Sequence, residues 1–195
     1  ADILIKGNNN FTAPIRSVSG DITLDGTNTW FGNPVLEQAT TIQSGVLKLL
    51  SAGALGSGGL NLALSGTGRV AFAGISQTIR QISSVSTSGI NNDGAPDDFT
   101  GATDLIFDLQ TSQTVAASIK DGITVSNTGV APLKIVKKGP GVLTLNNVGN
   151  NFSAGVEILE GALNVTSIAS SNQSSALGRA SALDPSLLVI DKSVL

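Results

Sequence analysis

The stretch "GPGVLTLNNVGNNFSAGVEILEGALNV", residues 139–165, decides the fold class of this chain. It holds three short runs in which apolar and polar residues alternate, Val142–Leu145, Val156–Leu159 and Leu163–Val165, separated by Asn and Gly. Alternation over a few residues, bounded by turn residues, predicts β-strands joined by tight turns. Because the stretch contains no His, Cys or Lys, it offers structure and little reactive chemistry.

Runs of the same kind occur along the whole chain, whereas helical spacing over three turns does not. They are rich in Val, Ile, Leu and Thr, the composition typical of strands. All-β is therefore the predicted class. The other runs are Ile3–Ile5, Ile22–Leu24, Val46–Leu49, Leu60–Leu64, Val70–Phe72, Leu105–Leu109, Leu133–Val136 and Leu187–Ile190.

The strands recur in repeats. The pattern Gly-x-apolar-x-apolar begins at Gly20, Gly45, Gly141 and Gly161, and an aromatic residue follows an Asn-rich turn at Phe11, Trp30 and Phe152. Repeats of roughly 20 residues built from short strands are typical of a solenoid. A longer duplication is superimposed, because "ALG" at 54–56 recurs at 176–178, at about the same offset as Gly20 to Gly141.

These patterns favour a right-handed parallel β-helix (β-solenoid) over the alternative, an antiparallel sandwich. We expect one segment spanning 1–195, with an irregular excursion at about 74–128. Leu145 and Leu163 should point inward, with Thr144 and Asn164 outward. Turn residues Asn8, Asn28 and Asn150 are expected to stack as a ladder of side-chain amides.

Composition limits the function. The net charge of −3 disfavours nucleic acid as a partner. There is no His, the commonest general base, and no Cys for a disulfide or thiolate metal site. No apolar run of about 18 residues and no signal peptide is seen, so we expect no direct membrane insertion by this segment.

Residues 133–165, followed by "SSALG" at 174–178, resemble the autotransporter-associated β-strand repeat of bacterial type V secreted proteins. The matching elements are Lys138–Gly141, Leu143-Thr144-Leu145, Asn151-Phe152 and Gly161-Ala162-Leu163, ending at Ala176-Leu177-Gly178. Residues 22–58 form a looser second copy, which departs from the pattern by an insertion at 35–44. The resemblance implies an exported β-helical stalk that is a fragment of a longer passenger, secreted or exposed at the bacterial outer membrane.

The densest group of chemically useful residues is the acidic stretch 91–108, with Asp93, Asp97, Asp98, Asp104 and Asp108. Its oxygen ligands would suit Ca²⁺, but it lacks the spacing of an EF-hand or of a nonapeptide β-roll array. We therefore interpret it as an exposed loop whose carboxylates keep ordinary pKa values, and whether it binds calcium stays open. No catalytic, cofactor-binding or metal-binding residue is assigned.

Two smaller features have structural interpretations. The basic cluster "KIVKKG" (134–139), with Lys137 and Lys138, is expected to be a solvated strand edge that discourages edge pairing. Trp30 and Phe31 could stack on a sugar ring, although we expect one ring to fill the core. Arg16, Arg69, Arg80 and Arg179 are scattered in the sequence. Binding residues are expected in the loops 33–44 and 88–103, where the repeat is interrupted.

The predicted function is a structural stalk or passenger segment of a secreted or cell-surface autotransporter-like protein, an adhesin or virulence factor being one form of such a protein. Its partner would be a host-surface or cell-surface ligand, or another copy of itself. Two alternatives stay open: a β-helical carbohydrate-active enzyme fragment, and a self-assembling solenoid of a surface layer or filament. We expect no enzymatic activity and no cofactor.

Overall fold

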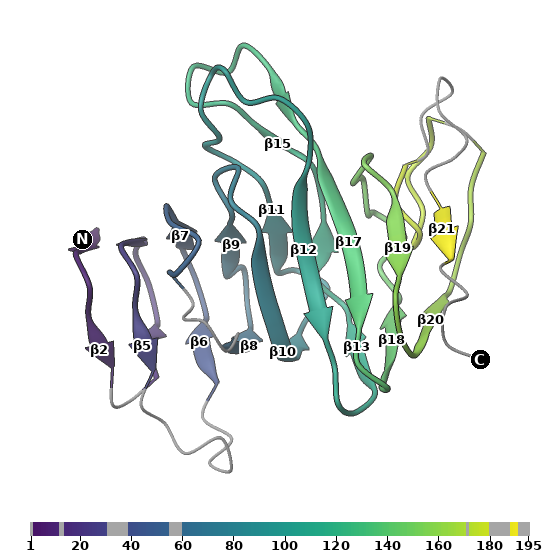
Figure 1. Cartoon of the computed structure of the whole chain (residues 1–195), viewed down its shortest axis with the longest axis horizontal. Coiled ribbons are helices and arrows are strands. Elements are labelled where there is room, and N and C mark those ends of the chain that lie inside the picture. Colours follow the sequence, from purple (N-terminus) through teal and green to yellow (C-terminus); the bar gives the residue numbers. More distant parts are fainter. Residues whose placement is uncertain are drawn as a thin grey trace.

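The computed structural model describes residues 2–11, 14–30, 39–54, 60–170, 172–179 and 188–190. Those residues form short strands and turns, with no helix among them. Figure 1 shows the strands following one another along the longest axis of the molecule in the order of the sequence. The all-β class predicted from alternation is confirmed for the part of the chain described.

Two large sheets contain most of the strands. The six-stranded sheet has the order β1 (Ile3–Lys6), β4 (Ile22–Asp25), β7 (Val46–Leu49), β9 (Arg69–Ala71), β11 (Gly89–Asn91) and β14 (Ser118–Ile119). The eight-stranded sheet has the order β3 (Arg16–Ser17), β6 (Thr40–Ile42), β8 (Leu60–Leu64), β10 (Gln77–Ser84), β12 (Thr103–Asp108), β17 (Leu133–Lys138), β19 (Val156–Ile158) and β21 (Leu188–Ile190).

Three small sheets complete the set. One contains β13 (Gln113–Val115), β18 (Val142–Leu145) and β20 (Ala162–Val165). The others are the pairs β2 (Asn10–Phe11) with β5 (Thr29–Trp30), and β15 (Gly122–Ile123) with β16 (Val130–Ala131). All strand pairs are parallel except β15 with β16.

The pairing register follows the repeat. Ile3 pairs with Ile22 on β1 and β4, and Ile22 pairs with Leu47 on β7, so partners lie roughly 20 to 30 residues apart. Between two partners the chain visits the other large sheet and returns; we call this length of chain a circuit. Parallel pairing between successive circuits is consistent with a β-solenoid and leaves no place for the antiparallel sandwich.

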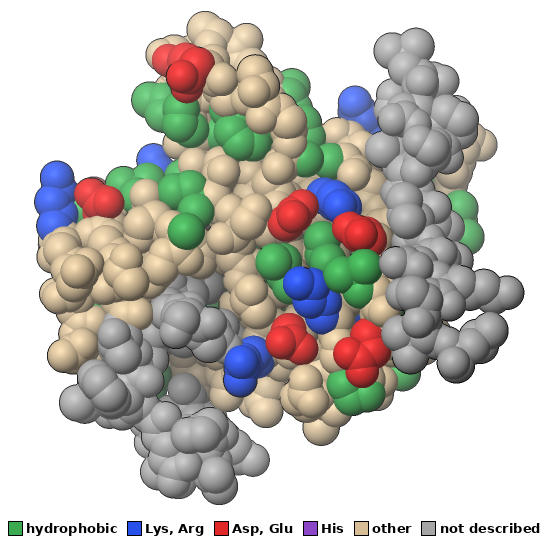
Figure 2. All heavy atoms as spheres, viewed as in Figure 1, with side chains coloured by type: hydrophobic (Ala, Val, Ile, Leu, Met, Phe, Trp, Pro, Cys, Tyr) green, Lys and Arg blue, Asp and Glu red, His purple; other side chains and the backbone are tan. Residues whose placement is uncertain are grey.

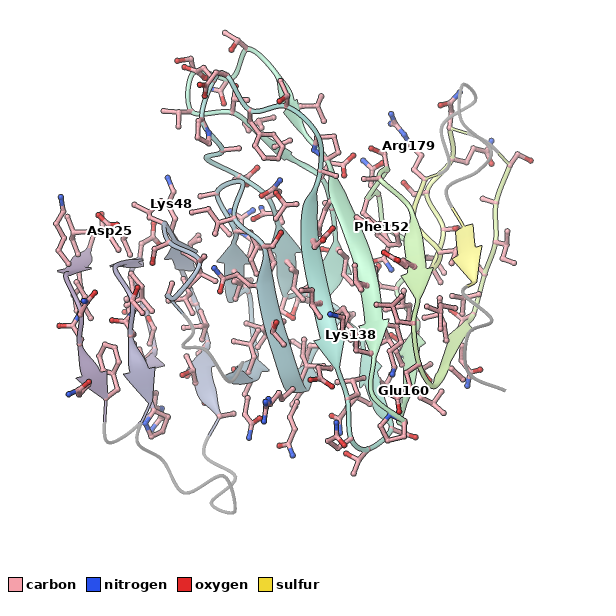
Figure 3. All side chains as sticks on the ribbon, viewed as in Figure 1. Asp25, Lys48, Lys138, Phe152, Glu160 and Arg179 are labelled. Atoms are coloured by element: carbon pink, nitrogen blue, oxygen red, sulfur yellow. The ribbon has the colours of Figure 1, made fainter. Side chains whose placement is uncertain are left out.

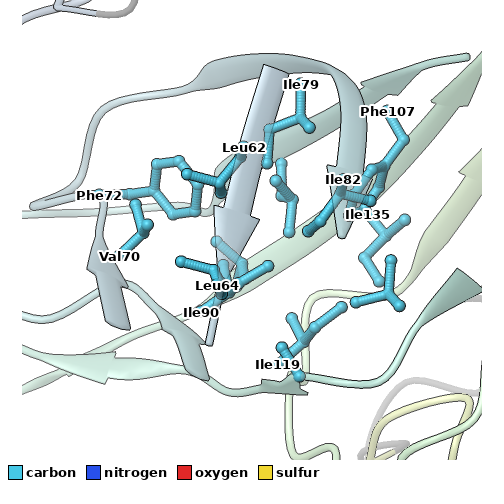
Figure 4. Packing of buried hydrophobic residues seen from close by; sticks show 14 of the residues in the cluster. Leu62, Leu64, Val70, Phe72, Ile79, Ile82, Ile90, Phe107, Ile119 and Ile135 are labelled. Carbon is cyan, nitrogen blue, oxygen red and sulfur yellow. The ribbon is translucent and has the colours of Figure 1, made fainter. Parts of the chain in front are cut away.

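The core runs between the sheets and is lined by alternate residues of each strand. On β18, Leu143 and Leu145 are fully buried while Thr144 is half-buried, as the alternation predicts. Leu163 packs partly buried against the same core and Asn164 is exposed, so both inward assignments are confirmed. Among the described side chains, Phe72, Phe107 and Phe152 are the largest apolar ones with full burial. Figure 4 shows aliphatic side chains from neighbouring circuits packed around Phe72 and Phe107.

The glycine that opens each repeat strand is required by backbone stacking. Gly45 has φ +88, and a Cβ placed on it would lie 2.2 Å from the carbonyl oxygen of Gly20 in the preceding circuit. Gly161 has φ +76, and its Cβ would lie 2.5 Å from the carbonyl oxygen of Gly139. Both the left-handed backbone and the close approach exclude a side chain. The Gly-x-apolar-x-apolar pattern therefore marks positions where one circuit rests on the next.

Buried asparagines bond to the backbone at both "ALG" sequences. Asn28 donates from Nδ2 to the carbonyl oxygen of Ala54 at 3.0 Å, and Asn150 donates in the same way to Ala176 at 2.9 Å. Each amide thus ties an Asn-rich turn to the backbone of an alanine, Ala54 or Ala176, in the following circuit. The ladder of amides expected for Asn8, Asn28 and Asn150 is wrong: Asn28 accepts from Asn9, and Asn150 bonds only to backbone groups. Backbone carbonyls and N–H groups need these partners, because burial separates them from water.

Candidate functional site

A double loop rises from the sheets and is the most distinct feature of the surface (Figure 1, beside the label β15). It consists of residues 92–102 and 121–131, which belong to consecutive circuits, and we call it the projection. Its two loops are hydrogen-bonded to each other: Gly94 N–H donates to Ile123 O at 2.8 Å, and Val125 N–H donates to Ala95 O at 2.9 Å. The antiparallel pair β15–β16 closes the second loop. The projection is therefore an ordered element, held together by backbone bonds.

Two polar side chains fix the base of the projection. Asn92 is fully buried; it donates to Thr103 Oγ1 at 2.8 Å and accepts from Gly74 N–H at 2.7 Å. Asp121 accepts backbone N–H bonds from Leu133 at 2.8 Å and from Ser153 at 3.0 Å. Each of these side chains joins a loop end to an adjacent circuit, so both are scaffold residues of the projection.

The acidic stretch 91–108 is divided by the fold. Asp93, Asp97 and Asp98 lie in or at the base of the projection, whereas Asp104 and Asp108 lie on the outer face of β12. Of the described residues, no group of three or more Asp and Glu is placed to hold a metal ion. The single acidic loop expected from the sequence is therefore wrong, because residues 103–108 form a strand.

Asp97 is bound to the other loop of the projection. Its Oδ1 accepts from Ser126 N–H at 2.9 Å, and its Oδ2 accepts from the Ser126 hydroxyl at 2.6 Å. The hydroxyl bond first and the amide bond second lower the pKa of Asp97 below its usual value, since both stabilise the ionised form. The expectation of an ordinary pKa is thus wrong for Asp97, although its side chain stays at the surface.

Charged side chains alternate in sign across the outer face of the eight-stranded sheet (Figure 2). Register places Asp104 opposite Lys134, and Asp108 opposite Lys138. Lys134 Nζ forms an ion pair with Glu157 at 2.5 Å, and Figure 3 labels Lys138 and Glu160 on the same part of the molecule. Opposite charges on neighbouring strands favour this register over a slipped one. These charges are best explained by their effect on strand register, because the paired residues carry charges of opposite sign.

Lys137 corrects the interpretation of the basic cluster. It was expected to be solvated, but its side chain is fully buried, while Lys138 is exposed. The ammonium donates to the carbonyl oxygens of Lys138 at 2.6 Å, Gly139 at 2.7 Å and Glu160 at 3.2 Å. Burial lowers the pKa of Lys137, partly opposed by the charges of Glu160 and Asp108. Lys137 thus joins the turn after β17 to the turn after β19, and the period of two along β17 is the signal that would place it inward.

Most of the remaining predicted residues are dispersed over the described surface or lie outside it. The structure does not describe the side chains of Trp30 and Phe31, which were considered for sugar stacking. Residues 33–38 of the predicted loop 33–44 also lie outside the described part of the chain. Residues 40–42 form β6. The four arginines, Arg16, Arg69, Arg80 and Arg179, are exposed and come from four different parts of the chain. Arg69 borders a surface hollow together with Asp21 and Asp93, and both of these carboxylates accept backbone N–H bonds.

The projection also exposes apolar side chains. Ile123, Val125 and Val130 are all more than two-fifths exposed, and they lie on the loop that contains β15 and β16. Sequence reasoning missed them, because the run "GITVSNTGV" does not differ from an ordinary strand until its neighbours are known. No helix among the described residues is long and apolar enough to cross a membrane.

Fold and surface together define an all-β, repeat-built segment whose backbone circuits stack in parallel. Two of its segments, 19–49 and 135–165, match the Passenger-associated-transport-repeat family. They overlap the two copies predicted from the sequence, 22–58 and 133–165, so the resemblance is confirmed, and the chain is consistent with an autotransporter passenger domain with repeats. The matches cover about a third of the chain, and the family implies a secreted or cell-surface protein. Comparison with curated proteins and with solved structures gave no significant match.

Proposed function

We propose that the chain is a right-handed β-solenoid that serves as a rigid stalk in the passenger of an autotransporter-like protein, exposed at the bacterial outer membrane. The observation that carries the proposal is the pair of transport repeats, 19–49 and 135–165, each built into the stack of parallel strands. The stack is stabilised circuit by circuit, through glycine contacts and buried amides. Such a structure extends in one direction and holds what it carries away from a surface.

A stalk is favoured over an enzyme by how the carboxylates are used. Asp21, Asp93, Asp97 and Asp121 each accept backbone N–H bonds, which fixes loops and strand ends. A glycoside hydrolase needs two carboxyl groups facing one substrate at roughly 5 to 10 Å. We propose that the chain has no catalytic activity, that it needs no cofactor, and that an adhesive or virulence role resides in surface features such as the projection.

Display on cells tests the stalk proposal. The chain is placed between a bacterial export signal and an outer-membrane translocator, with a peptide tag at its amino end. We expect intact cells to bind an antibody against the tag and the chain to resist added protease. A chain that stays inside the cell envelope, or that is digested as an unfolded polypeptide, would contradict the proposal.

The absence of catalysis is tested separately on the purified chain. It is incubated with a panel of acidic and neutral polysaccharides, and reducing ends and unsaturated products are measured. We expect no product above a sample of heat-denatured chain. Product formation that is lost on replacing Asp104 and Asp108 by Asn would establish an enzyme on the outer face of β12.

A further inference from the structure

A hollow of about 180 Å³ lies on the outer face of the six-stranded sheet, at the foot of the projection. It is formed over β4, β7, β9 and β11, and the first residues of the projection border it. Register aligns Thr23, Lys48, Ala71 and Asn91 in one row across these four strands. Its volume is below the range of about 300 to 1,000 Å³ typical of enclosed ligand pockets. The hollow therefore suits a single ring of a larger molecule.

Two cations at the hollow have unused hydrogen-bond donors. Neither the Lys48 ammonium nor the Arg69 guanidinium forms a hydrogen bond or ion pair with any described residue. Lys48 Nζ lies against the backbone of Gly94, since a Cβ built there would be 2.6 Å from it. The stem of Arg69 lies beside Gly89, whose lack of a side chain leaves room for it. Figure 3 shows Lys48 near the end of β7 that faces the projection.

The two carboxylates at the hollow, those of Asp21 and Asp93, already accept hydrogen bonds from the protein. Asp21 Oδ1 accepts from Val46 N–H at 2.8 Å. Asp93 accepts from Ile123 N–H at 3.2 Å and from the Asn91 amide at 2.5 Å. Their remaining lone pairs can accept from hydroxyl groups, but their charge repels a bare polyanion. The hollow thus combines donors for one negative group with acceptors for hydroxyls.

Comparison of the two repeats shows that the fold does not require the charge of Lys48. Lys48 occupies the fourth position of Gly45–Leu49, and the corresponding residue of Gly161–Val165 is Asn164. Asp21, the residue after Gly20, corresponds to Val142. Lys48 and Asn164 lie on the repeat strands β7 and β20, so the strand is formed with an uncharged residue at this position. The charge of Lys48 therefore needs an explanation other than folding, whereas Asp21 also has a structural role as the acceptor of Val46 N–H.

We propose that the hollow binds one acidic sugar unit of a glycan. The carboxylate of the sugar lies between Lys48 and Arg69, where two charge-assisted hydrogen bonds hold it. Ring hydroxyls donate to Asp21 and bond to Thr23, and the apolar face of the ring rests on Val46 and Ala71, which also line the hollow. A neutral sugar would leave both cations without a partner, and a simple anion would leave the acceptors unused. The inference is independent of the proposed stalk function.

Titration with monosaccharides, followed by amide chemical shifts of the chain, tests the site. Glucuronate is the probe, with glucose and inorganic sulfate in parallel. We expect glucuronate to shift the amides of residues 21–23, 46–48, 69–71 and 91–94, and to bind at least tenfold more tightly than either comparison compound. No shifts with glucuronate would overturn the proposal, as would equal binding of glucose. Equal binding of sulfate would reduce the site to a simple anion site and overturn the sugar assignment.

Variants locate the binding. Lys48→Asn introduces the residue that the second repeat carries, and Arg69→Gln removes the second cation; each should weaken glucuronate binding about tenfold. Lys138→Asn and Arg80→Gln are the matched controls, because they make the same charge changes at exposed positions on the eight-stranded sheet, away from the hollow. Circular dichroism verifies that all four variants fold. Equal weakening in the controls would attribute binding to overall charge and refute the site.

Discussion

Replacing Gly161 by Ala tests the idea that the repeat glycines are set by contact between circuits. The added methyl group would lie 2.5 Å from the carbonyl oxygen of Gly139 and 2.6 Å from that of Gly141. Both are backbone atoms, so they cannot rotate away and the circuits must separate. The left-handed backbone at φ +76 costs an alanine about 1–2 kcal/mol. Overpacking adds about 1–3 kcal/mol, so unfolding should become easier by about 2–5 kcal/mol.

Gly101→Ala is the control that separates the two contributions. Gly101 also has a left-handed backbone, with φ +95, but a Cβ there meets nothing within 4 Å. It should therefore lose only the backbone contribution. Urea denaturation gives the two free energies of unfolding, and hydrogen exchange should locate the Gly161→Ala loss of protection in 139–165. If both variants lose the same stability within about 0.5 kcal/mol, contact between circuits does not explain the glycine pattern.

Three further predictions concern single side chains. Lys137→Met should lower the free energy of unfolding, measured in urea, by about 1–3 kcal/mol, because it leaves three carbonyl oxygens without their donor. Lys138→Met, at an exposed position, should change it by less than about 0.5 kcal/mol. Since the folded pKa of Lys137 lies below its unfolded value, stability should rise as pH increases through the lowered pKa, and Lys137→Met should abolish that rise. The hydrogen bond that Ser126 N–H donates to Asp97 should be fully present above pH 3.8 and be lost as pH falls through the lowered pKa of Asp97; a smaller protection factor of the Ser126 amide, absent in Asp97→Asn, is the measurement. Leu163→Asp should unfold the C-terminal circuits while exchange protection near the N-terminus persists, and uniform loss of protection would contradict the independence of circuits.

The strands and the stacking could be predicted from the sequence because both depend on local periodicity. Alternation located Leu145 and Leu163 inward, and the spacing of Gly20, Gly45, Gly141 and Gly161 indicated circuits. The physical reason for each repeated glycine or asparagine could not be predicted, because its contacts lie in the preceding or following circuit. The bonds from Asn28 to Ala54 and from Asn150 to Ala176, for example, join residues about 26 positions apart in successive circuits.

The candidate sites were harder to predict, because their residues meet across circuits of unequal length. Asp97 and Ser126 lie 29 residues apart, and no pattern in either loop indicates their contact. Lys137 follows the alternation of β17, yet its charge suggested that it is exposed. The carbonyl oxygens that bind its ammonium in place of water come from two turns, and the sequence does not indicate that these turns meet. The hollow at Lys48 and Arg69 likewise combines residues from four strands, none of which is unusual by itself.

The projection has a consequence for the use of this molecule as a carrier. Its two loops leave the stack from consecutive circuits and are anchored below their tips by Asn92 and Asp121. A foreign peptide spliced into the tip at Asn127, an exposed turn residue with φ 58, would leave those anchors untouched. The segment could therefore display epitopes for vaccination.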